Sequence, residues 1–292
     1  MPRRALSLAA ALCRELRGAA AAATGGGARD QLRDATGALE ALEGLLDRQP
    51  YSSVTARVVS VVLGSIEPAV RAATDATVAV AAAPPEGGGS GGGGSREAFL
   101  VVGESLRCFR ACCSVVGTVL QHYARKVYSC TPPFASLCRS LLRLFFRLAT
   151  APAPGGGGGN NVTKRTASAG AEADAGDHGS RFAVSVEEQV AAASVFSRVL
   201  EQFVPHKEVL KKYAAFLLLE YVSLAGAAAL EPAPRAALLS GVFAVMQACS
   251  RREMRQLHGL LLGSSPPTGT GQQVFRALNE EYQLQHKYVG KM

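Results

Sequence analysis

Apolar residues recur every three or four positions along the last hundred or so residues, which is the period of one face of an α-helix. Three such stripes are visible, and Pro205 ends the first of them. They comprise Val186, Val190, Ala193, Phe196, Leu200 and Phe203; Leu210, Tyr213, Leu217, Tyr221 and Leu224; and Leu238, Val242, Val245 and Cys249. The stretch from Ala236 to Ser250 carries no charge, so we expect a central helix there, covered on more than one side.

Polar residues mark where these helices begin. Three Ser/Thr residues are each followed three positions later by Glu or Gln, which is the spacing of a capping box. The pairs are Ser185 with Glu188, Ser250 with Glu253, and Thr270 with Gln273. The last pair opens a terminal helix whose apolar face, Val274, Phe275, Leu278 and Tyr282, should dock on the preceding helices.

Helical periodicity continues towards the N-terminus. We predict a helix over 31–47 with leucines 32, 39, 42 and 46 on one side. One or two helices follow over 53–82, interrupted near Gly64 and Pro68, and a long helical stretch, or two, covers 99–128. No segment alternates in the way of a strand, so we predict an all-α protein of antiparallel helix pairs, stacked as a solenoid or HEAT-like helical array.

The helix predicted from Thr131-Pro132-Pro133 is the most strongly amphipathic one. Its apolar face is Phe134, Leu137, Leu141, Leu144 and Leu148. Arg139, Arg143 and Arg147 form a ridge on the other side, and Arg125 and Lys126 precede it in the chain. Such a ridge suits phosphate groups or an acidic partner, and it equally suits an exposed face that is simply solvated.

Two glycine-rich stretches, 84–95 and 151–180, interrupt the pattern and read as disordered insertions in loops. They divide the chain into an N-terminal helical segment (1–83), a basic helical segment (96–150) and a C-terminal helical domain (181–292). The Asn161-Val162-Thr163 sequon falls in the second insertion and is interpreted as a chance match.

The net charge of +8 is unevenly distributed. Residues 96–150 carry +6, whereas 1–83 carry +1 and 181–292 carry +3. A basic balance favours an anionic partner such as RNA or a membrane surface without identifying it. Residues 1–23 are alanine-rich with four arginines and one acid, which fits an ordinary helix or an organellar presequence.

Part of the chain resembles a known family. The residues that carry the resemblance are His206-Lys207, Tyr213, the run Leu217 to Val222, the run Leu239 to Cys249, and Leu278 to Tyr282 with the terminal His286-Lys287-Tyr288-Val289-Gly290-Lys291. Together they resemble the C-terminal domain of the nucleolar pre-rRNA processing family "unhealthy ribosome biogenesis protein two", over about residues 186–292. Members are usually much longer helical chains, so we expect a truncated or an unusually short member.

The resemblance implies a non-catalytic factor in rRNA processing and early assembly of the large (60S) ribosomal subunit, located in the nucleolus of the nucleus. It also implies a pre-ribosomal particle as partner, with pre-rRNA, a larger helical sister scaffold and a DEAD-box helicase. His286, Lys287, Tyr288 and Lys291 form a basic tail that either staples the chain end or contacts RNA or a partner.

The remaining candidates for chemistry are weak. Seven cysteines contain no C-x-x-C pair, and although Cys108 and Cys112 could share a metal, we interpret the thiols as buried and free. The five histidines form no catalytic arrangement, and no phosphate loop, dinucleotide fingerprint or nucleophile elbow is present. We therefore predict no enzyme, cofactor, metal or small-molecule substrate.

A membrane span is also excluded, because Glu220 falls in the middle of the apolar run 213–230. The sequence leaves one alternative function open, a generic α-helical protein–protein adaptor with no RNA role. It would reside in an organelle matrix if residues 1–23 are a presequence.

Overall fold

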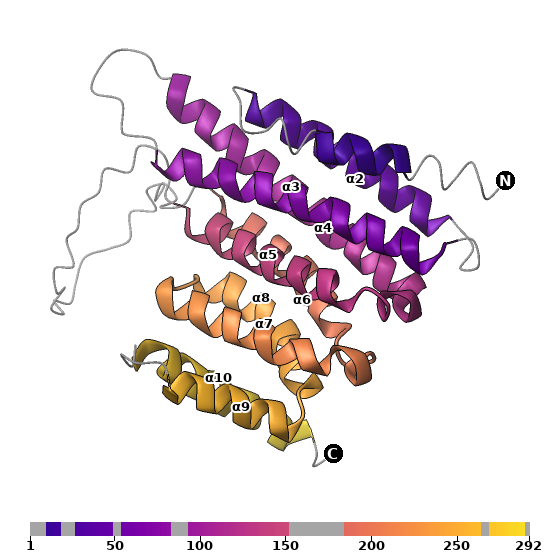
Figure 1. Cartoon of the computed structure of the whole chain (residues 1–292). Coiled ribbons are helices and arrows are strands. Elements are labelled where there is room, and N and C mark those ends of the chain that lie inside the picture. The colour runs from indigo at the N-terminus through magenta and orange to yellow at the C-terminus, as the bar shows by residue number, and fades with distance from the viewer. Residues whose placement is uncertain are drawn as a thin grey trace, which may run out of the picture.

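The computed structural model describes residues 10–18, 27–48, 54–82, 93–151, 184–263 and 269–289 (Figure 1). These residues form helices and short turns, with no strand among them, which confirms the all-α prediction. Residues 10–18 are helical, and nine further helices follow within the described ranges. They are α2 (Ala28–Asp47), α3 (Ala56–Ala82), α4 (Gly93–Val127), α5 (Thr131–Thr150), α6 (Val186–Glu201), α7 (Lys207–Ala227), α8 (Pro232–Ala248), α9 (Arg251–Gly263) and α10 (Gly269–Val289).

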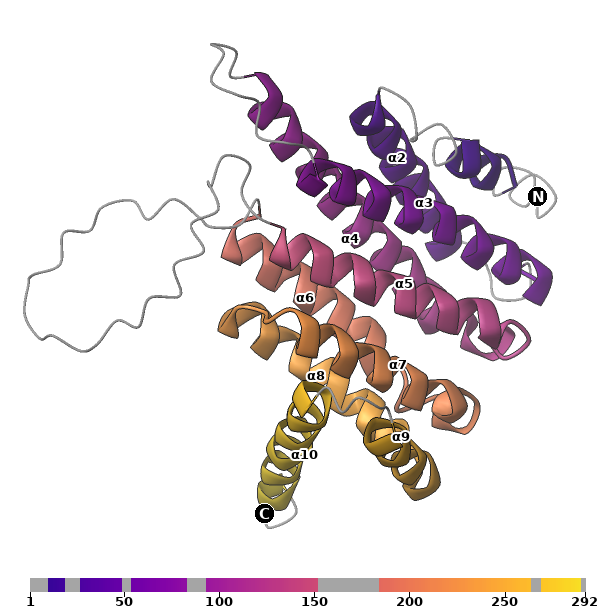
Figure 2. The ribbon, with the colours of Figure 1, turned by 60° about the vertical axis from the view of Figure 1, so that its left-hand side comes forward.

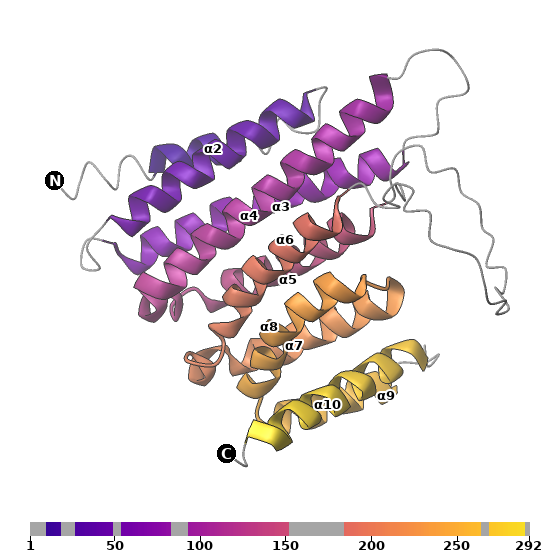
Figure 3. The same cartoon turned by 180° about the vertical axis from the view of Figure 1, so that it is seen from behind.

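Consecutive helices run antiparallel and stack into two layers. α3, α5 and α7 contact one another in one layer, and α2, α4, α6 and α8 do so in the other (Figures 1 and 3). α9 and α10 lie at the C-terminal end of the stack, where they diverge from each other (Figure 2). The predicted helical array is therefore confirmed. Residues 83–92 and 152–183, which include most of both predicted insertions, lie outside the described ranges.

One hydrophobic core runs through the whole stack, from Cys13 to Leu278. The ring of Phe109 lies at its centre, with centroids 6.0 Å from Phe145 and 5.9 Å from Phe196. α4 contacts α2, α3, α5 and α6, and α7 contacts α5, α8, α9 and α10, so these two helices each join four neighbours. α8 is covered by α6, α7 and the Tyr282 ring of α10, as predicted from its lack of charge, yet it lies near one end of the stack.

Two helix boundaries differ from the prediction. α3 continues through Gly64 and Pro68 without a break, because it is held along its length by α4 and α5, whose packing outweighs the one backbone hydrogen bond that proline removes. α4 begins at Gly93, inside the stretch predicted as a linker, and is kinked at Tyr123. There the buried Tyr123 hydroxyl donates to the Leu46 carbonyl over 2.7 Å.

Two of the three predicted capping boxes are present. Ser185 and Glu188 form a reciprocal pair at the start of α6, and Ser250 and Glu253 form one before α9. The third is not at a helix start, since α10 begins at Gly269 and already includes Thr270.

α8 crosses α6 closely at Gly241. A Cβ atom at this position would lie 2.7 Å from the Cα and 2.8 Å from the carbonyl oxygen of Ser197. The Gly241 amide donates to the Ser197 hydroxyl over 2.8 Å, and Ser240 lies 2.7 Å from the same oxygen. The crossing therefore depends on a residue without a side chain.

Candidate macromolecular interface

The predicted arginine ridge lies on α5, and its three side chains are exposed while the opposite face of the helix is buried. Two of the three arginines share one acceptor on the neighbouring helix α7. Arg139 donates to Glu220 over 2.8 Å and Arg143 over 2.5 Å. The Glu220 side chain is only 12% exposed, against 44% and 52% for the two arginines. The ridge therefore ties α5 to α7 as well as facing solvent.

The electrostatics of this group favour the ion pairs. Burial alone raises the pKa of the Glu220 carboxyl, but the hydrogen bonds and charges of Arg143 and Arg139 outweigh it, so that the pKa lies below its ordinary value near 4.5. The hydrogen bond to Glu220 likewise raises the pKa of the Arg143 guanidinium. Both shifts favour the charged forms of Glu220 and Arg143.

The sequence analysis did not identify Glu220 as the partner of Arg139 and Arg143. In the sequence, Glu220 only argued against a membrane span. A single carboxylate inside an apolar helical run is itself a signal, because a half-buried charge needs a cation beside it. The sequence does not show which cation, since 77 residues separate Glu220 from Arg143.

The other predicted contact residues lie in different places. Arg147 is exposed near the C-terminal end of α5, and no internal partner for it is found among the described residues. Arg125 is exposed at the end of α4, whereas Lys126 donates to the Val54 carbonyl. α10 extends to Val289, but the side chains of the predicted tail, His286, Lys287, Tyr288 and Lys291, lie outside the described part of the chain.

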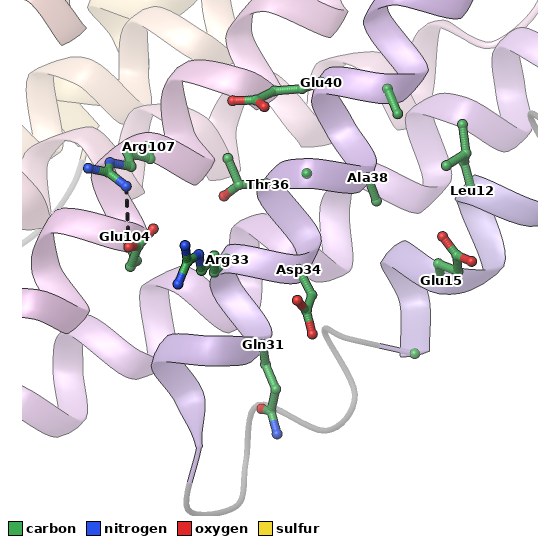
Figure 4. Close-up of a pocket in the computed structure, with 13 residues that line it drawn as sticks. Leu12, Glu15, Gln31, Arg33, Asp34, Thr36, Ala38, Glu40, Glu104 and Arg107 are labelled. Carbon is green, nitrogen blue, oxygen red and sulfur yellow. Dashed lines mark hydrogen bonds and ion pairs between the residues drawn. The ribbon is translucent and has the colours of Figure 1, made fainter.

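A cavity of about 1000 Å³ opens between the helix of residues 10–18, α2 and α4 (Figure 4). Its charged lining is mixed in sign, and the close-up shows Arg107 paired with Glu104 while Arg33 and Asp34 project separately. The Thr36 hydroxyl is committed to the Leu32 carbonyl at 2.7 Å. The lining contains no histidine or cysteine, and its carboxylates are those of Glu15, Asp34, Glu40 and Glu104.

The cysteines are unsuited to metal or thiolate chemistry. Cys108, Cys112, Cys113 and Cys138 are buried together between α4 and α5, and burial raises the pKa of the last three thiols. A thiol must lose its proton to ligate a metal or to attack a substrate. Among the described residues no group of three His, Cys, Asp or Glu side chains is placed to hold a metal ion.

Within the described ranges, each helix is too short or too polar to cross a bilayer. The described residues form an array of helices with extended, mostly polar outer surfaces. Such arrays serve as binding surfaces for other macromolecules.

Comparison with known proteins identifies one matching family model. A sequence model described as "Urb2/Npa2 family" matches residues 36–291, which extends well beyond the 186–292 region of the resemblance found in the sequence. No curated protein matches the chain. One solved structure, from work titled "Computational Design of Self-Assembling Cyclic Protein Homooligomers", is 12% identical with a TM-score of 0.49, covering 99% of this chain and 97% of that chain.

Proposed function

Because the chain belongs to the Urb2/Npa2 family, which acts in ribosome biogenesis, we propose that it is a non-catalytic scaffold for early assembly of the large ribosomal subunit in the nucleolus. The observation that carries the proposal is the family match over residues 36–291. The architecture supports it, since a two-layer helical array buries one core and leaves long faces for partners.

The partners proposed are pre-rRNA, a larger helical sister scaffold and a DEAD-box helicase within the pre-ribosomal particle. In this role the chain would hold immature rRNA and these proteins together during assembly. We also propose that the chain consists of three helical segments, 1–83, 96–150 and 181–292, joined by two insertions.

The α5 ridge remains a candidate contact surface, but its arginines differ in how firmly the protein itself binds them. Arg139 and Arg143 are held by Glu220, so reversing their charge would disturb the α5–α7 contact together with any partner. Arg147 has no such bond among the described residues, so its reversal reports on partner binding alone. It is the residue of the ridge to change first.

A helical adaptor in an organelle is the alternative. It requires residues 1–23 to be removed as a presequence. Cys13 and Leu16 of this segment are 2% and 0% exposed within the common core, and their loss would uncover apolar surface on the neighbouring helices. This burial favours an ordinary helix of the array over a presequence.

Depleting the protein by an inducible degron should lower newly made large-subunit rRNA at least about threefold relative to small-subunit rRNA, because a missing scaffold stops assembly of one subunit only. Pulse-labelled RNA resolved on gels measures both species. The control is a plasmid-borne copy of the protein without the degron tag, which should restore the ratio. An unchanged ratio after complete depletion would refute the proposed function.

A further inference from the structure

The described residues that flank the α2–α3, α4–α5, α6–α7 and α8–α9 connections lie together along one edge, on the right in Figure 1 and on the left in Figure 3. We call this strip the turn edge. It comprises the described residues 47–48 and 54–57 (α2 to α3), 125–131 (α4 to α5), 201–212 (α6 to α7) and 249–255 (α8 to α9). Side-chain contacts join neighbouring turns: Lys126 donates to the Val54 carbonyl, and the Tyr128 hydroxyl lies 3.2 Å from His206 Nδ1. α7 and α9 are also in contact.

The turn edge is strongly basic. Its described residues include ten Lys and Arg against four Asp and Glu. Eight of the cations are exposed, and Lys126 and Lys211 are half-buried. The exposed ones are Arg48, Arg57, Arg125, Lys207, Lys212, Arg251, Arg252 and Arg255.

Each of the four acids of the turn edge has a partner within the protein, although the side chains of Asp47 and Glu208 are 67% and 78% exposed. Asp47 lies 3.3 Å from His122, and Glu208 lies 3.3 Å from Lys211. Glu201 accepts from Ser240 over 3.0 Å, and Glu253 accepts from the Ser250 amide over 2.8 Å. Seven of the ten cations lie in the turns of α6–α7, α8–α9 and at Arg125, so the excess positive charge faces solvent along most of the strip.

The opposite edge is close to neutral. Its described residues, 17–18, 27–30, 78–82, 97–100, 147–151, 184–188, 227–235, 260–263 and 269–272, contain five acids and four arginines. One of those arginines, Arg235, is paired with Glu281 at 2.7 Å. The basic excess is therefore a property of one edge and not of helix ends in general.

Several of these cations lie at helix N-termini, where positive charge is unfavourable. Lys207 is the first residue of α7, Arg251 and Arg252 are the first two of α9, and Arg57 is the second of α3. The N-terminus of a helix carries partial positive charge and favours acids, so cations there weaken the helix. A cost that recurs at three helix starts on one edge indicates that the charges serve a partner.

The apolar content of the strip identifies the kind of partner. A protein interface is centred on a patch of apolar side chains, but the only large hydrophobic residue exposed among the described residues of the turn edge is Tyr128, at 40%. Cations with an isolated aromatic ring suit nucleic acid, in which phosphates meet the cations and a base stacks on the ring. We propose that the turn edge binds the phosphate backbone of RNA; the choice of RNA among polyanions rests on the proposed function.

The dimensions suit a short stretch of RNA. Packed helices are about 10 Å apart, so the three steps from α3 to α9 span about 30 Å. With one phosphate per about 3.4 Å of strand, that length corresponds to about nine nucleotides. The α5 ridge lies on the layer of α3, α5 and α7, away from this strip, so the two surfaces can be separated by mutation.

The test is fluorescence anisotropy of the purified full chain with a labelled 20-nucleotide single-stranded RNA of mixed sequence. The edge variant carries Lys207→Glu, Arg251→Glu and Arg252→Glu. Glutamate is favoured in the first turn of a helix, so this variant should fold. The matched control carries Arg33→Glu, Arg71→Glu and Arg276→Glu, three exposed arginines elsewhere that give the same change in net charge.

The edge variant should bind RNA at least about tenfold more weakly than the native chain. The plot of log association constant against log salt concentration should become shallower, its negative slope losing about 2 in magnitude, because three phosphate contacts with a single strand are lost. The control should change affinity less than about threefold. A neutral variant with Gln at the same three edge positions should lie in between, and it replaces the edge variant if circular dichroism shows the latter to be unfolded.

Three results would overturn the inference: a native chain that does not bind the RNA, equal losses in the edge and control variants, or polyglutamate competing as well as unlabelled RNA does. The last would assign the edge to an acidic protein. Since the assay contains only protein and RNA, its failure leaves the assembly proposal standing, and the depletion experiment decides that separately.

Discussion

Gly241→Ala should lower the free energy of unfolding by about 3 kcal/mol, the upper part of the range for overpacked cores. The added methyl group would lie 2.7 Å from the Cα of Ser197, and this neighbour is backbone that cannot rotate away. α8 would have to move off α6, which would also stretch the 2.8 Å bond from the Gly241 amide to the Ser197 hydroxyl. Urea unfolding followed by circular dichroism measures the change.

Gly117→Ala is the matched control for that substitution. Gly117 lies in the middle of α4, and a Cβ atom there would meet nothing within 4 Å. Alanine restricts the unfolded chain and favours helix, so this variant should be more stable by about 0.5–1 kcal/mol. The account predicts opposite signs for the same chemical change at two helical glycines. Destabilisation of similar size at both positions would contradict the helix crossing.

Glu220→Gln should destabilise the fold by about 1–2 kcal/mol at pH 7, because two guanidinium groups lose their shared carboxylate. The value is below that for a fully buried pair, since Arg139 and Arg143 are 44% and 52% exposed and water screens them. Glu208→Gln is the control: its partner Lys211 lies at 3.3 Å and Glu208 is 78% exposed, so the loss should be below about 0.5 kcal/mol.

The effect of Glu220 should also depend on pH in a defined direction. Its pKa in the folded protein is below the ordinary value near 4.5, so the carboxylate contributes its full stability above that pH. The contribution is lost as the pH falls through the folded-state pKa. The stability difference between the native chain and Glu220→Gln should therefore be constant from pH 7 to about 5 and shrink below pH 4.5. A difference that grows in acid would contradict the ion-pair geometry.

The sequence predicted local structure better than it predicted neighbours. The α5 face was found because Phe134 and Leu141 recur at helical spacing, and the start of α6 because Ser185 and Glu188 form a reciprocal pair. Pro68 misled the prediction, since its cost to α3 is a local term that packing against α4 and α5 outweighs. Packing between helices is not encoded in spacing within one of them.

The candidate sites show the same limit. Periodicity placed Arg139 and Arg143 on an exposed ridge, but only the tertiary fold brings Glu220 beside them. Likewise Lys207 and Arg251 are separated in sequence, and they lie along one edge only because every second helix starts there. The resemblance seen from residue 186 onward was also partial, because the family match begins at residue 36.

The central claim is that this chain acts on precursors of the large ribosomal subunit through a helical array that contacts RNA. Sucrose-gradient sedimentation of the tagged protein expressed from its own locus, with and without RNase, tests it most directly. We predict co-migration with large-subunit precursors and release to light fractions by RNase or high salt. A light peak that RNase does not change would contradict the account.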